Sequence, residues 1–212
     1  TFTTRGCIRQ CQFCGVPKFE GAFRELEHWD AKPIVCDNNL LAASRDHFDR
    51  VIDRLKPLKG VDFNQGLDAR LLTDYHAGRL TELDTLCVRL AWDHSKLEGQ
   101  FRKAFDTLIG VGFPASKVRV YVLIGFHDDP ADALHRLETV KALGAYPNPM
   151  RYQPLDSKRR NEYVSSSWSD AELKRYMRYW ANLRITWRIP FAEFRNRGDE
   201  PKRASIDQMG MI

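Results

Sequence analysis

The sequence predicts an α/β protein whose strands run parallel and alternate with helices. Runs of β-branched, aromatic and other apolar residues begin near residues 1, 33, 61, 86, 117 and 149. Between each pair of runs lies a helical segment, and the interval of about thirty residues is typical of βαβ units. Since eight such units close a barrel, six predict an open one. We therefore expect a partial, TIM-like (β/α)6 barrel over residues 1–155 and a helical, basic extension over residues 156–212.

The first half of the chain contains four expected strands separated by three expected helices. The strands occupy residues 1–4, 32–36, 61–65 and 86–92. The helices occupy residues 23–29, a segment between Ser44 and Leu55, and residues 73–83. Ser44 can cap the second helix, because the apolar residues that follow it have i, i+3, i+4 and i+7 spacing.

The second half repeats the pattern with clearer boundary signals. Residues 117–125 form the clearest strand, and residues 149–153 form a weaker one. Three helices are expected to begin after residues that commonly cap helices, which are Ser95 (with Glu98 as capping-box partner), Asp129 (before Pro130) and Ser169 (with Glu172). The last helix is expected to bury four side chains, namely Leu173, Tyr176, Met177 and Trp180. From Arg195 onward the chain is polar, and we expect a loose tail.

Composition places the chain among folded proteins without a membrane span. Of its 212 residues, 43% are hydrophobic and 11% aromatic, which excludes a disordered chain. No apolar run approaches the roughly 20 residues of a membrane-spanning helix, and no signal peptide opens the sequence. Cys36 and Cys87 are isolated and fit no disulfide framework, so we expect a reducing, cytoplasmic location. The sequence opens on Thr1 inside an expected strand, and we therefore expect an upstream element that it does not contain.

The formal net charge is +5, and basic residues gather in the C-terminal third of the chain. They include Lys158, Arg159, Arg160, Lys174, Arg175 and Arg178. Such a group indicates either a nucleic-acid surface or a solvated helix face. Because acids such as Asp170 and Glu172 accompany the bases, we favour the helix face and keep a nucleic-acid partner as the alternative.

Three of the five cysteines lie within eight residues, at positions 7, 11 and 14. They follow the first expected strand and precede Pro17, so they lie on a loop at the end of a strand. Three thiolates on one loop suit a soft metal centre. Zinc ordinarily takes a fourth protein ligand in a structural site, whereas a 4Fe–4S cluster held by three cysteines keeps one iron open. The alternative is three reduced cysteines without a metal.

The spacing resembles the C-x3-C-x-φ-C motif of the radical SAM superfamily, with Phe13 as the aromatic residue. The longer string from Gly6 to Gly21 is similar to the branch that holds methylthiotransferases and cobalamin-dependent members. The resemblance implies that Cys7, Cys11 and Cys14 bind a 4Fe–4S cluster whose open iron chelates S-adenosylmethionine (SAM). It also implies reductive cleavage of SAM to a 5′-deoxyadenosyl radical, which abstracts hydrogen from a substrate. The electron would come from an external donor such as flavodoxin or ferredoxin.

Alternation along the strands predicts a polar interior for the barrel. In the fourth strand, apolar residues from Leu86 to Trp92 alternate with Arg89 and Asp93, and in the fifth strand valines alternate with Arg119. Helices cover the outside of a parallel barrel, so the polar set is expected to point inward. That set comprises Asp62, Asn64, Arg89, Asp93, Arg119 and Tyr121. These groups are expected to bind a polar ligand, to pair with one another, or both; in the pairing alternative, Arg89 and Arg119 only neutralise Asp62 and Asp93.

The resemblance further implies which residues contact SAM. Asp37 or Asn38, at the tip of the second strand, would hold the methionine amino group where related proteins have a Gly-Gly-Glu-like turn. Asp93 and Arg89 would reach the ribose hydroxyls or the methionine carboxylate. The remaining expected cofactor contacts are Phe13, Leu123, Gly125, Tyr152 and Gln153. Further candidates are Arg70 for the substrate and His94 or His127 as proton donors, whereas Asp128 and Asp129 are better explained as a helix cap.

We therefore interpret the chain as a radical SAM enzyme acting on an unidentified substrate. One alternative is a methylthiotransferase-like or cobalamin-assisted enzyme that modifies RNA, although the chain has no second cysteine cluster. Another is a non-catalytic iron–sulfur or zinc module that contacts nucleic acid through the basic tail. The polar barrel interior discriminates between these classes, since a binding module does not require it.

Overall fold

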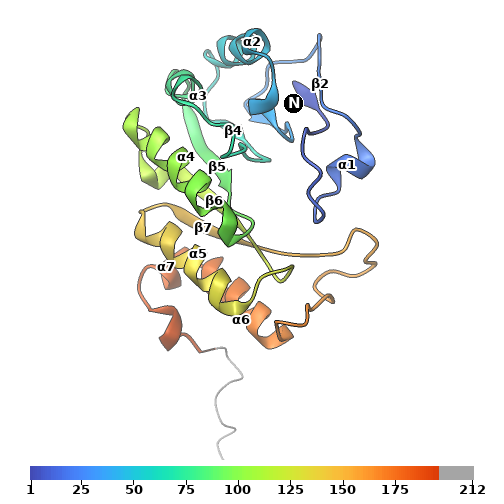
Figure 1. The fold of residues 1–212 in the computed structure, drawn as a ribbon. Coiled ribbons are helices and arrows are strands. Elements are labelled where there is room, and N and C mark those ends of the chain that lie inside the picture. Colours follow the sequence, from blue (N-terminus) through green and yellow to red (C-terminus); the bar gives the residue numbers. More distant parts are fainter. Residues whose placement is uncertain (196–212) are drawn as a thin grey trace, which may run out of the picture.

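The computed structural model describes residues 1–195, so the expected loose tail lies outside the described residues (Figure 1). Its strands are β1 (Thr4–Arg5), β2 (Arg24–Glu25), β3 (Ile34–Val35), β4 (Val61–Phe63), β5 (Thr85–Ala91), β6 (Val118–Ile124) and β7 (Tyr146–Arg151). Its α-helices are α1 (Val16–Phe19), α2 (Arg45–Leu55), α3 (Asp74–Leu80), α4 (Glu98–Gly110), α5 (Pro130–Ala142), α6 (Asp170–Trp180) and α7 (Leu183–Thr186). Short 3-10 turns span Leu40–Ala42, Ser95–Leu97, Ala115–Lys117 and Phe191–Glu193. Within residues 1–195, no helix is long and apolar enough to cross a membrane.

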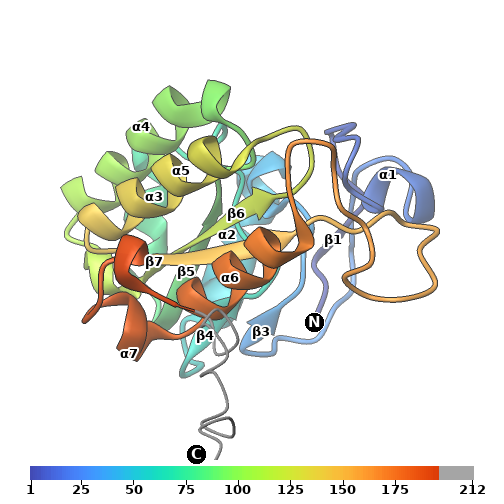
Figure 2. The ribbon, with the colours of Figure 1, turned by 90° about the horizontal axis from the view of Figure 1, so that it is seen from below.

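A five-stranded sheet in the order β3-β4-β5-β6-β7 forms the centre of the molecule, and every neighbouring pair is parallel. The spatial order equals the sequence order, and right-handed crossovers therefore place the connecting helices on one face. Figure 2 shows α3, α4 and α5 together on one side of the strands. The predicted α/β class with parallel βαβ units is confirmed. We call the helix-covered face of the sheet the outer face and the opposite one the inner face.

The outer face carries the apolar side chains that the alternation predicts. On β6, Val118, Val120, Val122 and Ile124 are fully buried, as are Val88 and Leu90 on β5. Burial of each such side chain stabilises the fold by about 1.5–3 kcal/mol.

Leu86 is an exception, because it was expected on the outer face and is exposed. Val61 of β4 pairs with Thr85, whereas the next residue, Asp62, pairs with Cys87. This irregularity in the pairing skips Leu86, which interrupts the alternation at the start of β5.

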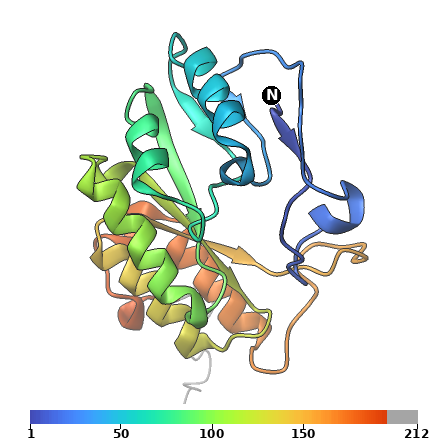
Figure 3. The same cartoon turned by 45° about the horizontal axis from the view of Figure 1, so that its top comes forward.

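The N-terminal segment differs from the expectation. β1 pairs antiparallel with β2, so the helix expected over residues 23–29 is wrong, and a short strand stands there. Ahead of β1, Thr1 donates its amino group to the Ile34 carbonyl (2.6 Å) and accepts from the Cys36 amide (2.7 Å). That is the pattern of a parallel neighbour of β3. The chain therefore begins beside the β3 edge of the sheet and then turns away; Figure 3 shows this segment (blue) far from α4 and α5.

Most predicted helix starts are confirmed by side-chain caps. Ser44, Thr73, Asp129 and Ser169 each accept a hydrogen bond from a backbone amide of the first helical turn, and Ser169 forms the expected capping box with Glu172. The box predicted for Ser95 is wrong. Residues Ser95–Leu97 form a 3-10 turn and α4 begins at Glu98, whose carboxylate binds Arg102 and His135 instead of a backbone amide.

The last strand and the last long helix complete the outer layer. β7 begins at Tyr146, three residues before the expected strand, and its prolines are tolerated because it is an edge strand of the sheet. α6 buries Leu173, Tyr176 and Trp180 as predicted, while Met177 is only partly buried and Tyr179 is buried as well. These side chains belong to the same hydrophobic core as the outer faces of β5 and β6. The division near residue 155 stays a prediction.

Candidate metal centre and adjoining cavities

The cysteine loop connects β1 to α1 and is shaped by a glycine at its start. Gly6 has a φ of 72°, and a Cβ atom there would lie 2.3 Å from the Ala22 carbonyl oxygen, so no other residue fits. Within the loop, the Cys14 amide donates to the Cys11 carbonyl at 3.0 Å, which closes a tight turn. Two of the three cysteines are thereby fixed on one turn.

All three cysteines line a single cavity of about 120 Å³ at the carboxyl ends of the strands. The residues that line it come from the cysteine loop, from the segments after β3 and β4, from the end of β5 and from the start of α4; they include Phe13, Asn38, Asn39, Asp68, Arg70 and Asp93. The predicted position of the loop is therefore confirmed. Across residues 1–195, however, no three His, Cys, Asp or Glu side chains form a ready-made metal-binding group. The three thiols share a cavity without converging on one point.

The chemistry around the thiols fits an iron–sulfur cluster. The Arg9 amide lies 3.3 Å from Cys7 Sγ, and the Asn39 side-chain amide lies 3.5 Å from the same atom. N–H groups directed at a sulfur tune the properties of a cluster that the sulfur binds. Burial raises the pKa of the Cys11 thiol, and the nearby Arg70 opposes that effect. A soft three-sulfur donor set with N–H partners is what such a cluster requires.

Asp68 links the cysteine loop to the sheet, although the sequence pattern did not single out this residue. Its carboxylate accepts from Arg9 Nε at 3.0 Å, from the Asn39 amide at 3.3 Å and from Arg70 Nε at 2.6 Å. Burial alone would raise the pKa of Asp68, but Arg70 and Arg9 outweigh it and lower the pKa. The signal for this position was Gly66, whose φ of 93° ends β4 and turns the chain toward the site.

Asp93 lies between the first cavity and a second one of about 490 Å³, because both cavities include Asp93 and Phe13. Burial raises the pKa of Asp93 to about 6, although Arg70 and Arg136 act in the opposite direction. Within residues 1–195 its carboxylate has no hydrogen bond or ion pair. The candidates His94 and His127 also line the second cavity.

We expect Asp93→Asn to increase the free energy of unfolding at pH 8. The folded pKa of about 6 exceeds the ordinary 3.8, so the folded state binds the proton more tightly. This contribution to stability is present at low pH and is lost as the pH rises from about 4 through 6. At about 1.4 kcal/mol per pKa unit, the gain in the free energy of unfolding at pH 8 is on the order of 3 kcal/mol. Urea unfolding at pH 8 and pH 4 measures this gain. The difference in the free energy of unfolding between Asp93→Asn and the unaltered chain should nearly vanish at pH 4. As a control, Asp106→Asn at an exposed position should show no comparable gain at pH 8.

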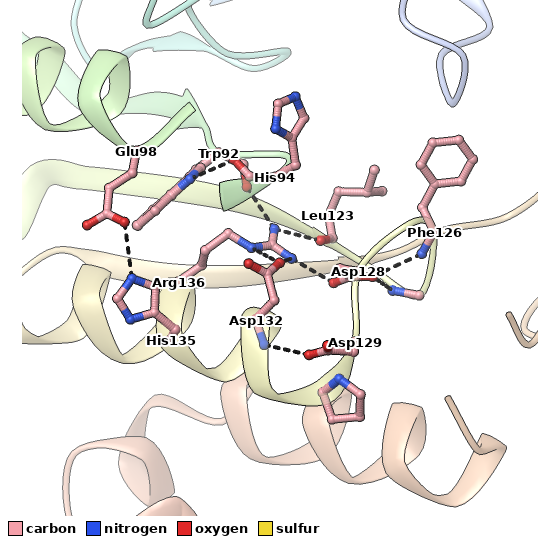
Figure 4. A network of polar contacts seen from close by, with 12 residues as sticks. Trp92, His94, Glu98, Leu123, Phe126, Asp128, Asp129, Asp132, His135 and Arg136 are labelled. Atoms are coloured by element: carbon pink, nitrogen blue, oxygen red, sulfur yellow. Dashed lines mark hydrogen bonds and ion pairs between the residues drawn. The ribbon is translucent and has the colours of Figure 1, made fainter. Parts of the chain in front are cut away.

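Arg136, a fully buried arginine of α5, binds the backbone next to Asp93 (Figure 4). It donates to the carbonyls of Trp92 at 3.0 Å and Leu123 at 2.8 Å, and therefore joins the ends of β5 and β6. It also forms ion pairs with Asp128 (2.6 Å) and Asp132 (2.9 Å). The charge of Arg136 is thus matched, and its donors hold the backbone on both sides of the second cavity.

Asp128 and Asp129 have different roles, although both were predicted to cap a helix. Asp129 is the N-cap of α5, as predicted. Asp128 accepts from the amides of Gly125 at 2.8 Å and Phe126 at 3.1 Å, and so stabilises the turn after β6. Burial raises the pKa of Asp128, and Arg136 counteracts this.

Some of the predicted SAM contacts line one of the two cavities, and the others line neither. Phe13, Asn38 and Asp93 line the first cavity, and Leu123 lines the second. Asp37 does not line either one: it is buried and accepts from the amides of Thr3 (2.6 Å) and Thr4 (2.9 Å) and from the Thr3 hydroxyl. Its carboxylate is therefore committed to holding the N-terminal segment, and Asn39 takes the place beside the cysteines.

Arg89 is likewise outside both cavities, because it forms an ion pair with Asp62 on the neighbouring strand. The pairing that we considered as an alternative is therefore present for Arg89. Asp93 is not paired with Arg119 in the same way, since the charges that act on it belong to Arg70, Arg136 and Asp68.

The three remaining predicted contacts also lie outside the two cavities. Gly125 has a φ of 77° and packs against Leu173 of α6. The Tyr152 ring contacts the rings of Phe126 and Tyr163, with centroids 4.5 and 5.1 Å away. The Gln153 amide binds the Arg159 carbonyl at 2.8 Å. Gly125 thus lies in the turn after β6, and Tyr152 and Gln153 lie in the loop after β7.

Comparison of the chain with protein-family models gives no match, and neither does comparison with curated protein sequences.

Proposed function

We propose that the protein is a radical SAM enzyme whose parallel sheet is part of an open (β/α)6 barrel. The observation that carries this proposal is the single cavity in which Cys7, Cys11 and Cys14 meet polar side chains from the ends of three successive strands. In parallel α/β sheets, reactive groups gather at that edge. A site of this composition offers both soft metal ligands and polar partners for a charged organic molecule.

The chain's own residues divide the work of holding cluster and cofactor. Cys7, Cys11 and Cys14 would ligate a 4Fe–4S cluster, which when bound supplies one electron to SAM. The Asn38 and Asn39 side chains present amide oxygens suited to an ammonium group, and the Arg70 guanidinium is suited to a carboxylate.

Asp93 and Phe13 act where the two cavities meet. A carboxylate without a partner among residues 1–195 accepts hydrogen bonds readily, so Asp93 suits the hydroxyl groups of a ribose. The Phe13 ring packs edge-on against Phe126, with centroids 5.8 Å apart, and this aromatic pair limits the access of water. The second cavity gives room for the nucleoside or for substrate. The electron would come from an external donor such as a flavodoxin or ferredoxin.

Reconstitution under anaerobic conditions tests this proposal. The reduced protein should contain iron and show an electron paramagnetic resonance spectrum that changes when SAM is added, because SAM would bind the open iron. Adenosine, which lacks the amino acid end, should leave the spectrum unchanged. Zinc bound in place of iron, or a spectrum insensitive to SAM, would contradict the proposal.

A further inference from the structure

The inner face of the sheet is exposed at its two edge strands, while Asp62 and Arg89 in its middle are buried. Ile34 on β3 and Met150 on β7 are 52% and 46% exposed, whereas the outer-face residues Val118 and Val120 of β6 are fully buried. Parallel sheets are ordinarily covered on both faces. The β7 side of the inner face, with the partly exposed Arg119 next to it, is therefore a surface that a ligand can cover.

One row of side chains across the inner face has more positive than negative charges. The register places Arg89, Arg119 and Tyr146 side by side on β5, β6 and β7. Arg119 stands between the buried Val118 and Val120, so its side chain lies on the inner side. Asp62 forms an ion pair with Arg89. Within residues 1–195, Arg119 has neither an ion pair nor a side-chain hydrogen bond, and one positive charge of the row is left unmatched.

The neighbours of Arg119 do not supply the missing negative charge. Its charge acts on Cys87, whose pKa is raised by burial and lowered by Arg119, and on Arg89, which is also a cation. A half-buried cation beside another one is unfavourable unless an anion joins them. The guanidinium group binds phosphate and carboxylate oxygens through two parallel N–H donors. The complement of this row is therefore an oxyanion.

The edge of the row suits an organic anion rather than a bare inorganic ion. Tyr146 packs edge-on against Trp187 of the α7 region, with ring centroids 6.4 Å apart, and Trp187 is 46% exposed. Further along β7, the exposed Met150 continues the apolar border. A ligand held by Arg119 would thus have apolar and aromatic surface beside it along β7.

We propose that Arg119 binds an oxyanion group of the substrate, a phosphate or a carboxylate, on the inner face of the sheet. This inference rests on the proposed function, because only a reaction at the cysteine loop makes such a ligand a substrate. Arg119 precedes Leu123 of the second cavity by four positions on β6, which corresponds to about 13 Å along a strand. The substrate therefore has its oxyanion at one end and its reacting part at the other.

Titration of the full chain with inorganic phosphate and, separately, with acetate tests the site. Nuclear magnetic resonance of the Trp187 indole and of the β6 amides should report saturable binding of at least one of the two, and the tighter one identifies the group. Arg119→Gln should weaken binding at least tenfold, while Lys103→Gln, which makes the same charge change on an exposed position of α4, should not. Asp62→Asn should tighten binding several-fold, because it removes the partner of Arg89.

The titration needs neither cluster nor SAM, so its outcome is independent of the proposed function. Unchanged binding in Arg119→Gln would overturn the inference even if SAM chemistry is present. If Arg119→Gln fails to fold, the titration of Asp62→Asn replaces it. Unaltered anion binding in Asp62→Asn would then overturn the inference. Binding that depends on Arg119 in a protein that takes up no iron would support the oxyanion site and contradict the proposed function.

Discussion

Replacement of Cys11 by alanine is expected to abolish iron binding and, with it, any cleavage of SAM. Cys11 lies on the turn closed by the Cys14 amide and lines the cavity with Cys7 and Cys14. With only two thiols left on the loop, a three-cysteine cluster loses one of its three protein ligands. Iron analysis after anaerobic reconstitution measures the effect. The unaltered chain should hold about four iron atoms, as a 4Fe–4S cluster requires, and Cys11→Ala close to none.

Cys36→Ala and Cys87→Ala are the matched controls, because each removes one thiol that does not line the cavity. Both variants should retain iron at the level of the unaltered chain. An equal loss in either control would mean that the cluster is not held by the loop. Full iron content in Cys11→Ala would have the same consequence.

The second large effect is expected from Arg136→Met, which should destabilise the fold by about 3–5 kcal/mol, the usual cost of breaking a buried ion pair. Arg136 is fully buried, and its removal leaves the buried Asp128 carboxylate without its cationic partner and the carbonyls of Trp92 and Leu123 without the Arg136 donor. Chemical denaturation followed by circular dichroism measures the change.

Arg102→Met provides the matched control on α4. Arg102 also pairs with an acid four positions earlier, Glu98, but both side chains are partly exposed. Surface pairs of this kind contribute about 0.3–0.5 kcal/mol. A loss of similar size in the two variants would show that the Arg136 network does not hold the ends of β5 and β6.

Much of the fold could be predicted from local signals. β6 is a long alternating strand with capping residues nearby, and Asp129 before Pro130 defines the start of α5 without reference to the rest of the chain. The failures occurred where a distant contact decides the structure. The segment over residues 23–29 has helical character, yet Glu25 pairs with Thr4 and accepts from the Ser44 amide, so it is part of a strand.

The candidate site shows the same division. The cysteine spacing located the candidate site, because all three cysteines lie on one loop and line one cavity. Asp37 and Asn39 are two positions apart in the sequence, and only the tertiary contacts with Thr3 and Thr4 reveal that Asp37 is a structural residue. Asp68 was missed because its partners, Arg9 and Asn39, come from segments far away in the chain. Roles set by long-range pairing cannot be read from local pattern.

The most direct test of the account is the release of 5′-deoxyadenosine by the reconstituted, dithionite-reduced protein given SAM alone. Chromatography of the nucleoside products should show slow release that requires Cys11 and leaves the Cys36→Ala variant active. Release at the same rate in Cys11→Ala would be chemical background. An intact cluster that changes its spectrum with SAM but yields no 5′-deoxyadenosine would contradict the proposed catalysis and would favour a binding module instead.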